Sequence, residues 1–322
     1  MWSKSKCGVL SLNYSIAVLQ GLEAPRNAIM KSGFVAIIGR PNVGKSTLLN
    51  HLLGQKISIT SRRPQTTRHR IHGIRTTEEG QAVFVDTPGI HQSDERAMNR
   101  YMNRAARSAL VDVDLILWVI DRMDFLAEDD LVLGCLHSTR VPVILVINKV
   151  DRIEDKALLL PFLDAAQARF PFIDMIPLSA LRGENLAALE KRIFEFLPEG
   201  DRIFPEDQVT DRPMRFIAAE IVREKLLRSL SQEVPYALTV EIEEYREEEG
   251  ITHVRALILV ERSGQKAIVI GKNGEVLKKV GERARIDLER LIEGKVCLKL
   301  WVKVKEGWSD DERALRSLGY SA

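Results

Sequence analysis

Short apolar runs separated by polar stretches mark the first part of the chain. They occupy residues 34–38, 82–85, 115–120, 143–147 and 172–177. The runs are continuous rather than alternating, as in strands of a parallel sheet that is buried on both faces. Those at 115–120 and 143–147 are too short to span a bilayer. The pattern predicts an α/β domain with a doubly wound sheet over residues 33–198.

The last part of the chain has a different period. Apolar and polar residues alternate over 236–242, and a second segment, 251–260, follows the acidic turn 247–250. This arrangement predicts a hairpin. Apolar residues then recur at helical spacing over 276–291, and an alternating strand is predicted over 296–304. This order of elements predicts an α+β domain.

Length and composition fit two domains. The chain has 322 residues, of which 45% are hydrophobic and 29% charged, as in an ordinary soluble protein. The polar stretch 199–212, which contains Pro205, is predicted to be the linker, and 213–322 the second domain with a C-terminal tail. Residues 1–32 carry no complete signal-peptide pattern and are expected to form a disordered extension.

The first apolar run leads into a glycine-rich sequence and then into a predicted helix. The sequence is Gly39-Arg40-Pro41-Asn42-Val43-Gly44-Lys45-Ser46, which has the phosphate-binding pattern G-x-x-x-x-G-K-[ST]. In this pattern backbone N–H groups wrap a triphosphate, the lysine spans the terminal phosphates, and the serine hydroxyl ligates magnesium. All residues from Gly39 to Thr47 are therefore predicted to bind a nucleotide.

The base specificity is predicted from two later strand ends. Asn148, Lys149 and Asp151 follow the run 143–147 in an N-K-x-D pattern, and the aspartate can accept both the N1 and N2 hydrogens of guanine. Adenine lacks that pair of donors at this edge, so GTP is predicted over ATP. A loop that resembles the S-A-x guanine loop follows the run 172–177; its residues are Ser179, Ala180 and Leu181.

A magnesium site and two switches are predicted between these motifs. The D-x-x-G element is Asp86-Thr87-Pro88-Gly89, in which the aspartate reaches Mg2+ through water and the glycine N–H senses the γ-phosphate. In the stretch 63–70 one threonine would close onto the metal in the GTP state. Thr67 is favoured, with Thr66 as the alternative, so the predicted metal ligands are Ser46, Thr67 and Asp86.

The catalytic group is not evident in the sequence. Where many GTPases place a water-orienting glutamine after D-x-x-G, this chain has Ile90, which cannot hold water. Asn42 is of the type through which related GTPases hold K+ near the transferred phosphoryl group, and it could equally be a turn former. Asn42, Thr67 and Gly89 are the candidates for stabilising the transition state, and slow intrinsic turnover is expected.

The second domain contains a G-x-x-G loop between two predicted helices. The sequence is Ile270-Gly271-Lys272-Asn273-Gly274, and in KH modules such a loop clamps the backbone of about four nucleotides of single-stranded RNA. From residue 262 to residue 305 there are 12 Lys or Arg against 5 acidic residues, although the whole chain carries only +2. Lys278, Lys279 and Arg283 are predicted to join the loop in binding RNA.

Taken together, the motifs resemble those of the Era family of bacterial GTPases from residue 33 to residue 320. The resemblance implies a P-loop GTPase domain followed by a type II KH domain, with GTP or GDP and Mg2+ bound. It also implies recognition of the 3′ end of 16S ribosomal RNA, a role in maturation of the 30S subunit, and peripheral association with the inner membrane. The alternative is an RNA-binding module whose GTP is structural and never hydrolysed.

The cysteines agree with a cytoplasmic protein. Cys7, Cys135 and Cys297 form neither a C-x-x-C pair nor an even disulfide framework, so a reducing compartment is expected. The chain is expected to be a monomer.

Overall fold

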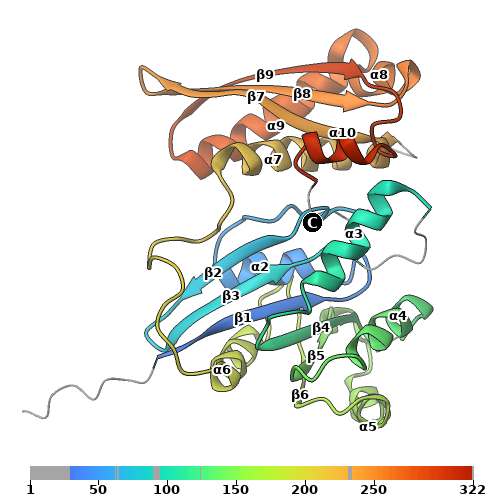
Figure 1. Ribbon diagram of the computed structural model, residues 1–322, viewed down its shortest axis with the longest axis vertical. Helices are drawn as coiled ribbons and strands as arrows, with labels where there is room; N and C mark the ends of the chain where they lie inside the picture. Colours follow the sequence, from blue (N-terminus) through green and yellow to red (C-terminus); the bar gives the residue numbers. More distant parts are fainter. Residues whose placement is uncertain are drawn as a thin grey trace, which may run out of the picture.

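The computed structural model describes residues 30–61, 63, 65–89, 95–123, 125–230 and 234–320. Two domains stand one above the other in Figure 1, with the sheet of the first domain below and that of the second above. The expected N-terminal extension up to residue 29 lies outside the described residues, as does Ile90. The first strand begins at Lys31, slightly before the expected start at residue 33.

The first domain is built on a six-stranded sheet with the order β2-β3-β1-β4-β5-β6. The strands are β1 (Lys31–Ile38), β2 (Ile71–Thr76), β3 (Gly80–Asp86), β4 (Leu115–Asp121), β5 (Val143–Asn148) and β6 (Asp174–Pro177). Only β2 runs antiparallel, paired with β3 at the sheet edge, and the other neighbours are parallel. The predicted α/β class is confirmed, because the continuous apolar runs form strands that are buried on both faces.

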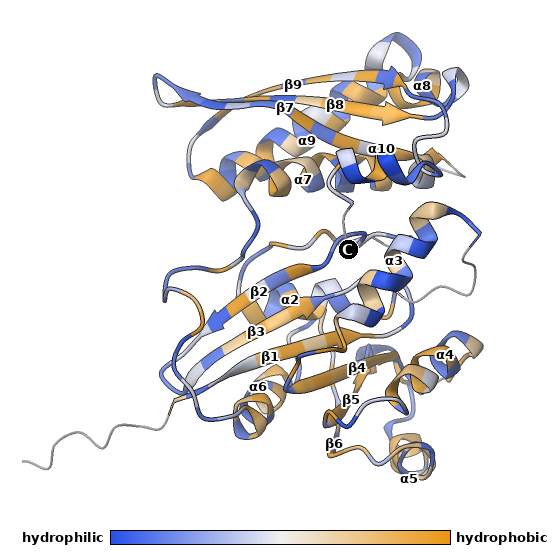
Figure 2. Ribbon diagram, in the orientation of Figure 1, coloured by the Kyte–Doolittle hydropathy of each residue, from blue (hydrophilic) through white to orange (hydrophobic). Residues whose placement is uncertain are grey.

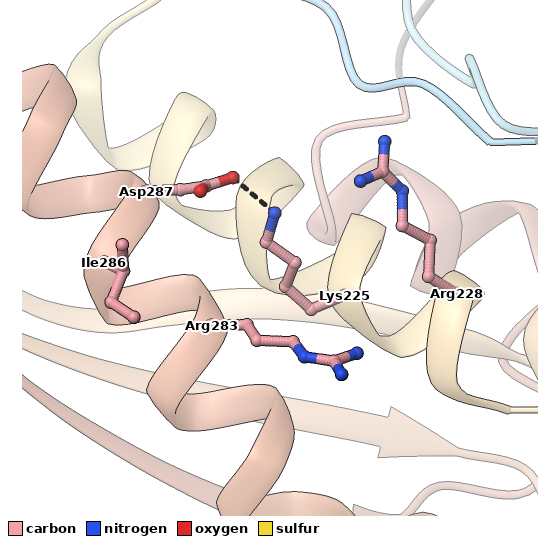
Figure 3. A pocket seen from close by; sticks show the side chains of 5 residues that line it. All are labelled: Lys225, Arg228, Arg283, Ile286 and Asp287. Atoms are coloured by element: carbon pink, nitrogen blue, oxygen red, sulfur yellow. Dashed lines mark hydrogen bonds and ion pairs between the residues drawn. The ribbon is translucent and has the colours of Figure 1, made fainter.

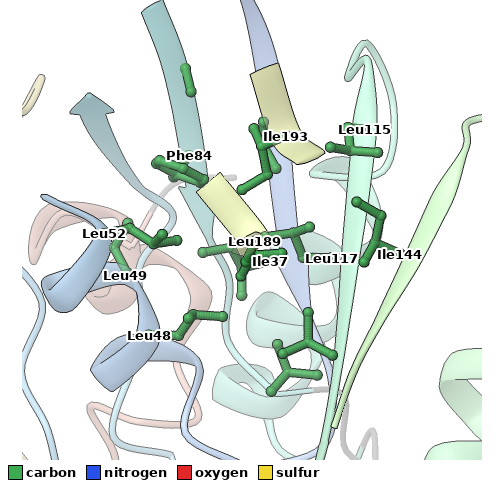
Figure 4. Close-up of a cluster of buried hydrophobic side chains, with 14 of the residues drawn as sticks. Ile37, Leu48, Leu49, Leu52, Phe84, Leu115, Leu117, Ile144, Leu189 and Ile193 are labelled. Carbon is green, nitrogen blue, oxygen red and sulfur yellow. The ribbon is translucent and has the colours of Figure 1, made fainter. Parts of the chain in front are cut away.

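Helices cover both faces of this sheet (Figure 1). They are α2 (Lys45–Leu53), α3 (Ala97–Ser108), α4 (Ala127–Leu136), α5 (Leu159–Arg169) and α6 (Leu186–Phe196), with the 3-10 turns η1 (Val150–Arg152) and η2 (Lys156–Leu158). One core lies beneath α2 and α6 and contains Leu48, Phe84 and Leu189 (Figure 4). The other contains Trp118 and packs against α4 and α5. The orange strands in Figure 2 run between these two cores.

The second domain has a three-stranded sheet with the order β7-β8-β9, of which β8 and β9 are parallel. Its elements are α7 (Met214–Ser229), η3 (Val234–Ala237), β7 (Leu238–Glu248), β8 (Ile251–Val260), α8 (Ser263–Ile270), η4 (Lys272–Gly274), α9 (Glu275–Ile292), β9 (Lys295–Val304) and α10 (Glu312–Ser317). The predicted hairpin, helix and final strand are all present. Strand β7 begins at Leu238 rather than at Tyr236, because Tyr236 lies in η3.

The predicted linker is tied to the edge of the first sheet. The side chain of Gln81 accepts hydrogen bonds from the backbone N–H groups of Ile203 and Phe204, both at 2.8 Å, and donates to the Phe204 carbonyl at 2.9 Å. Further along, Thr210 forms an isolated bridge with Gly73 on β2. The linker between the two domains is thereby bonded to the first domain.

The C-terminal tail packs back onto the first domain. Met98, Tyr101 and Met102 of α3 form a small apolar cluster with Trp308 and Tyr320. The ring of Tyr320 also stacks on His69, with ring centroids 4.4 Å apart. Within the part of the chain that the structure describes, no helix combines the length and the apolar character that crossing a membrane requires.

Candidate functional site

The phosphate loop connects β1 to the first turn of α2. Gly44 has φ 106° and precedes Lys45, the first residue of α2, so the helix N-terminus faces the loop. The Lys45 ammonium donates hydrogen bonds to the carbonyl oxygens of Gly39 at 2.8 Å and Arg40 at 2.9 Å. The lysine is thus held inside the curve of the loop, where a bound phosphate chain would meet it.

Lys45 is in an unusual environment for a lysine. It is 6% exposed, and burial lowers its pKa to about 8, although the Asp86 carboxylate opposes that shift. An anionic ligand at the loop would stabilise the ammonium form and replace the water that the side chain has lost. The loop therefore favours a ligand with several negative charges.

Four oxygen-bearing side chains converge beside Lys45. The hydroxyls of Ser46 and Thr67 are 2.9 Å apart, and Ser46 donates to Asp86 Oδ2 at 3.1 Å. Ser58, which the sequence analysis missed, also donates to that Oδ2, at 2.8 Å. The other oxygen, Asp86 Oδ1, is buried and has no hydrogen-bond partner among the described residues. Hydroxyl and carboxylate oxygens around an unpaired buried acceptor fit Mg2+.

The geometry distinguishes the two candidate threonines of the switch. Thr67 Oγ1 lies 3.4 Å from Asp86 Oδ2 and is buried within the oxygen cluster. Thr66 instead donates its hydroxyl to the Arg63 carbonyl at 2.6 Å, within a local turn. Only Thr67 therefore shares the site with Ser46 and Asp86.

The predicted guanine-binding residues also come together. Asn148 donates to the Val43 carbonyl at 2.8 Å, and its Oδ1 accepts from the N–H of Ala180 at 2.9 Å. It therefore joins the phosphate loop to the loop after β6. The Ser179 hydroxyl donates to Asp151 Oδ1 at 2.6 Å, which lowers the pKa of Asp151 and keeps its carboxylate ionised.

Lys149 connects the phosphate loop to a neighbouring strand. It has φ 63°, and its ammonium donates to the Asn42 carbonyl at 2.7 Å. The same ammonium is 2.7 Å from Asp121 Oδ2, at the end of β4. The stem of the side chain therefore extends along the face where a base would lie between the two loops.

The other predicted nucleotide-site residues have diverse surroundings. Arg40 turns away from the loop and pairs at 3.0 Å with the buried Asp129 of α4, an acid that the sequence analysis missed. Thr87 points inward and donates to the Ile37 carbonyl at 2.9 Å. Leu181 is exposed. Gly89 lies against Pro41. Thr47 is half-buried and Pro88 is buried.

The G-x-x-G loop forms η4, between α8 and α9. Lys272 and Asn273 are exposed, and Asn273 has φ 52°. A hollow of about 400 Å³ opens beside the loop, between α9 and β9. Its lining residues are Gly274, Leu277, Lys278, Gly281, Glu282, Arg285, Leu298 and Leu300.

The helical repeat relates most of that lining to the loop. Lys278, Glu282 and Arg285 follow Gly274 at steps of three or four residues, so they lie along one face of α9. The same spacing in the sequence would have identified Gly281 and Arg285, which the prediction omitted. Arg283, which the prediction included, lies on a different face and lines a second hollow against α7. Lys279 is exposed and lines neither hollow.

The switch that carries Thr67 also contacts the second domain. The adjacent Arg68 is fully buried and donates to the carbonyl oxygens of Leu238 at 2.8 Å and Tyr236 at 2.9 Å. From the other side Arg223 of α7 donates to the Thr66 carbonyl. The metal-site threonine is thus flanked on both sides by residues bonded across the domain boundary.

Comparison with known protein families matches residues 34–149 to a family described as 50S ribosome-binding GTPase and residues 233–309 to the KH domain. GTPase Era of Ectopseudomonas mendocina is 56% identical over 292 residues, which cover 91% of this chain and 98% of that protein. GTPase Era of Pseudomonas aeruginosa is 59% identical over 290 residues, or 90% of this chain and 95% of that protein. The chain belongs to the Era family of GTPases.

Solved structures of this family have the same fold. One is Aquifex aeolicus Era bound to GDP.AlF4-, with a TM-score of 0.88 and 41% identity over 91% of this chain and 100% of that chain. A second, with the same TM-score, identity and coverage, is Era in complex with MgGDPNP and nucleotides 1506-1542 of 16S ribosomal RNA. Family membership makes this chain a GTPase, which disfavours the alternative of a purely structural GTP.

Proposed function

We propose that this GTPase is an assembly factor of the small ribosomal subunit whose nucleotide state governs how its KH domain grips RNA. The RNA is the 3′ end of 16S ribosomal RNA, and the process is maturation of the 30S subunit. One observation carries the proposal: Thr67 of the oxygen cluster is followed directly by Arg68, which is bonded to the KH domain. The bound RNA fragment of an Era structure supports the choice of RNA.

Further contacts support a connection between the switch and the KH domain. Upstream in the same segment, the Thr60 N–H donates to Glu224 of α7 at 3.0 Å, and the Lys56 ammonium lies 2.5 Å from the same carboxylate. If loss of the γ-phosphate and the metal releases Thr67, the bonds of Arg68 and Thr60 must rearrange as well. Helix α7 and the start of β7 would then shift relative to the nucleotide site.

In this proposal the nucleotide site binds GTP or GDP with Mg2+. Lys45 and the backbone of residues 39–47 hold the phosphates, Ser46 and Thr67 ligate the metal directly, and Asp86 ligates it through water. Asp151 accepts from the guanine edge, and the backbone of Gly89 senses the γ-phosphate. Bound Mg2+ would neutralise the developing charge on the phosphates. Asn42 would hold K+, which compensates for the missing water-orienting glutamine.

In the second domain the exposed G-x-x-G loop clamps the RNA backbone, and the hollow between α9 and β9 receives bases of the same strand. The partner is a single strand rather than a duplex, because a G-x-x-G loop clamps a single-stranded backbone. The apolar side chains that line the adjoining hollow, Leu277, Leu298 and Leu300, would receive unpaired bases. We further propose a cytoplasmic location with peripheral association with the inner membrane. Cys135 and Cys297 are free, which agrees with a reducing compartment.

The test compares RNA affinity in two nucleotide states. A labelled strand that copies the 3′ end of 16S ribosomal RNA is titrated with the protein bound to a non-hydrolysable GTP analogue or to GDP. We expect the two affinities to differ in the parent protein and to become equal in Arg68→Ala, which lacks the bonds to Leu238 and Tyr236. Arg70→Ala is the matched control, because Arg70 donates to His72 within its own domain. An unchanged difference in Arg68→Ala would refute the coupling.

A further inference from the structure

A second hollow lies on the KH domain between α7 and α9 (Figure 3). It has a volume of about 270 Å³ and is lined by Lys225, Arg228, Arg283, Ile286 and Asp287. It shares no lining residue with the hollow beside the G-x-x-G loop. It belongs to neither the nucleotide site nor the RNA clamp described above.

Asp287 of this hollow and the adjacent Glu224 of α7 are already shared among three cations. Glu224 pairs with Lys225 at 3.0 Å, with Arg228 at 3.0 Å and with Lys56 of the first domain at 2.5 Å. Asp287 pairs with Lys225 and, at 3.2 Å, with Lys56. These pairings lower the pKa of both acids against the opposing effect of burial, so both are ionised near neutral pH. Both carboxylates are therefore already neutralised by Lys56, Lys225 and Arg228.

That fourth cation is Arg283. It extends from α9 toward α7 in Figure 3, and no carboxylate pairs with it in the part of the chain that the structure describes. Its neighbour Arg285, by contrast, pairs with Glu289 at 2.7 Å along the exposed side of the helix. Arg283 lines the hollow together with Lys225 and Arg228, so an anion placed there would be attracted by all three cations. The hollow thus has the charge of an anion site.

The remaining wall is apolar and accessible. Ile286 is 41% exposed beside the cations, so a ligand that reaches Arg283 also covers this side chain. The volume is below the range of about 300–1,000 Å³ typical of pockets that enclose whole small ligands. The ligand must therefore be small, carry negative charge for the guanidinium groups and cover the isoleucine. A phosphate with its attached sugar does this, because the phosphate contacts the guanidinium groups and the sugar covers the isoleucine.

We propose that this hollow binds a backbone phosphate of RNA, at a segment other than the strand held by the G-x-x-G loop. The inference rests on the proposed function, because it adds a second contact for the same RNA. Arg283 supplies the free guanidinium, and Arg228 and Lys225 complete the binding site. Arg228 also donates to the Thr60 carbonyl at 2.9 Å, so the second contact adjoins the segment that leads to the switch.

The experiment uses the full chain and two RNA probes. The long probe has nucleotides 1506-1542 of 16S ribosomal RNA, the fragment bound in the Era structure, and the short probe copies only its 3′-terminal strand. Affinities are measured over a salt series for the parent protein and for Arg283→Glu. Arg313→Glu is the control, because Arg313 is an exposed arginine on α10 and the substitution changes the net charge equally.

Arg283→Glu should weaken binding of the long probe by roughly tenfold and reduce the salt slope by about one, as expected for one lost phosphate contact. It should leave binding of the short probe unchanged, and Arg283→Lys should recover much of the loss. Arg313→Glu should resemble the parent protein with both probes. Equal losses with both probes, or no loss with either, would overturn the proposal.

The hollow could instead bind a free phosphate ion, which has the same charged oxygens as an RNA phosphate. Inorganic phosphate is titrated against the parent protein and Arg283→Glu, with chloride at matched ionic strength. Phosphate binding that depends on Arg283, without any effect of Arg283→Glu on the long probe, would assign the hollow to a free anion and overturn the RNA contact. Failure of the short probe to bind the parent protein would instead count against the proposed function of the G-x-x-G loop.

Discussion

The molecule contains two glycine loops that each lead into a helix, and they differ in how far they are enclosed. The phosphate loop, residues 39–46, runs into α2 at Lys45, and the G-x-x-G loop, residues 271–274, leads into α9 at Glu275. Both therefore present a helix N-terminus to a negatively charged ligand. Lys45 is 6% exposed, whereas Lys272 stands on the surface.

This difference determines what each loop can do with a phosphate. Around the phosphate loop, hydrogen bonds from Lys45 and Asn148 fix the backbone, and charges are little screened by water. Such a site can hold one ligand in one geometry, as phosphoryl transfer requires. Around the G-x-x-G loop, water and salt compete for every phosphate, so affinity there depends on the total charge of the surface. The first loop suits chemistry and the second suits a strand that must later be released.

The largest effect on stability and GTP binding is expected from adding a methyl group at Gly39, in the enclosed phosphate loop. Gly39 has φ 144°, and a Cβ atom at this position would lie 2.3 Å from the Val119 carbonyl oxygen in β4. Since backbone cannot move as a side chain can, Gly39→Ala should destabilise the first domain by about 3 kcal/mol or more and abolish GTP binding. Hydrogen exchange resolved by domain and nucleotide titration check this. Normal GTP affinity in Gly39→Ala would show that the loop is less rigid than its contacts imply.

At the open G-x-x-G loop, charge should determine the RNA affinity. Replacing Lys272 and Asn273 by aspartates sets two carboxylates against the RNA backbone where it approaches the loop, and should weaken binding of the short RNA strand by roughly a hundredfold or more. GTP affinity should be unchanged, because both residues are exposed and remote in sequence from the phosphate loop. The measurement is a titration of labelled RNA across a salt series. Undiminished RNA affinity would mean that the G-x-x-G sequence is only a tight turn.

The specificity of the enclosed nucleotide site for guanine is tested at Asp151. Asp151→Asn presents an amide donor to the guanine N1 and N2 hydrogens, and an unmatched buried donor costs about 1–3 kcal/mol. GTP affinity should fall by roughly a hundredfold, with a gain for xanthosine triphosphate, measured by calorimetry. The Ser179 hydroxyl that donates to Asp151 at 2.6 Å keeps its partner oxygen in the variant, so the loop should remain folded. Equal GTP binding by variant and parent would remove Asp151 from the site.

The sequence predicts the enclosed site better than it predicts the surroundings of that site. Lys45, Asp86 and Asn148 follow buried strands at fixed spacings, and parallel strands bring their carboxyl ends to one edge. The apolar runs predict the order of elements because a strand buried on both faces can tolerate few polar residues. The motifs therefore follow from the local sequence pattern, and their convergence follows from the common edge at which parallel strands end.

The domain boundary could not be predicted in the same way. Arg68 bonds to the carbonyl oxygens of Leu238 and Tyr236, and a backbone acceptor leaves no trace in the residue type. In the sequence Arg68 is one basic residue among several in a polar segment, with nothing to mark it as fully buried. The antiparallel strand β2 was missed because its apolar residues are few, and the short α10 because its burial depends on α3.

A smaller effect is expected from the cation in the hydrolysis assay. Asn42 is exposed at the rim of the phosphate loop, with φ 65°, and its amide could reach a K+ ion beside the phosphates. Turnover should be slow and should fall by roughly tenfold when Na+ replaces K+, because a misplaced charge stabilises the transition state less. Asn42→Ala should be slow in both salts. Fast hydrolysis that is indifferent to the cation would contradict the role of Asn42.

The smallest effect is expected where the open loop receives the same methyl group as the enclosed one. Gly274 has φ 80°, but a Cβ atom there would meet nothing within 4 Å, in contrast to Gly39. Gly274→Ala therefore bears only the left-handed backbone strain, about 1–2 kcal/mol, and the KH domain should remain folded. RNA affinity should fall only a few-fold, since the methyl group faces the approaching backbone while the charge of Lys272 is retained. The check pairs domain-resolved hydrogen exchange with the RNA titration. A loss in Gly274→Ala as large as that in the double aspartate variant would mean that shape, rather than charge, controls the open loop, and the contrast between the two loops would fail.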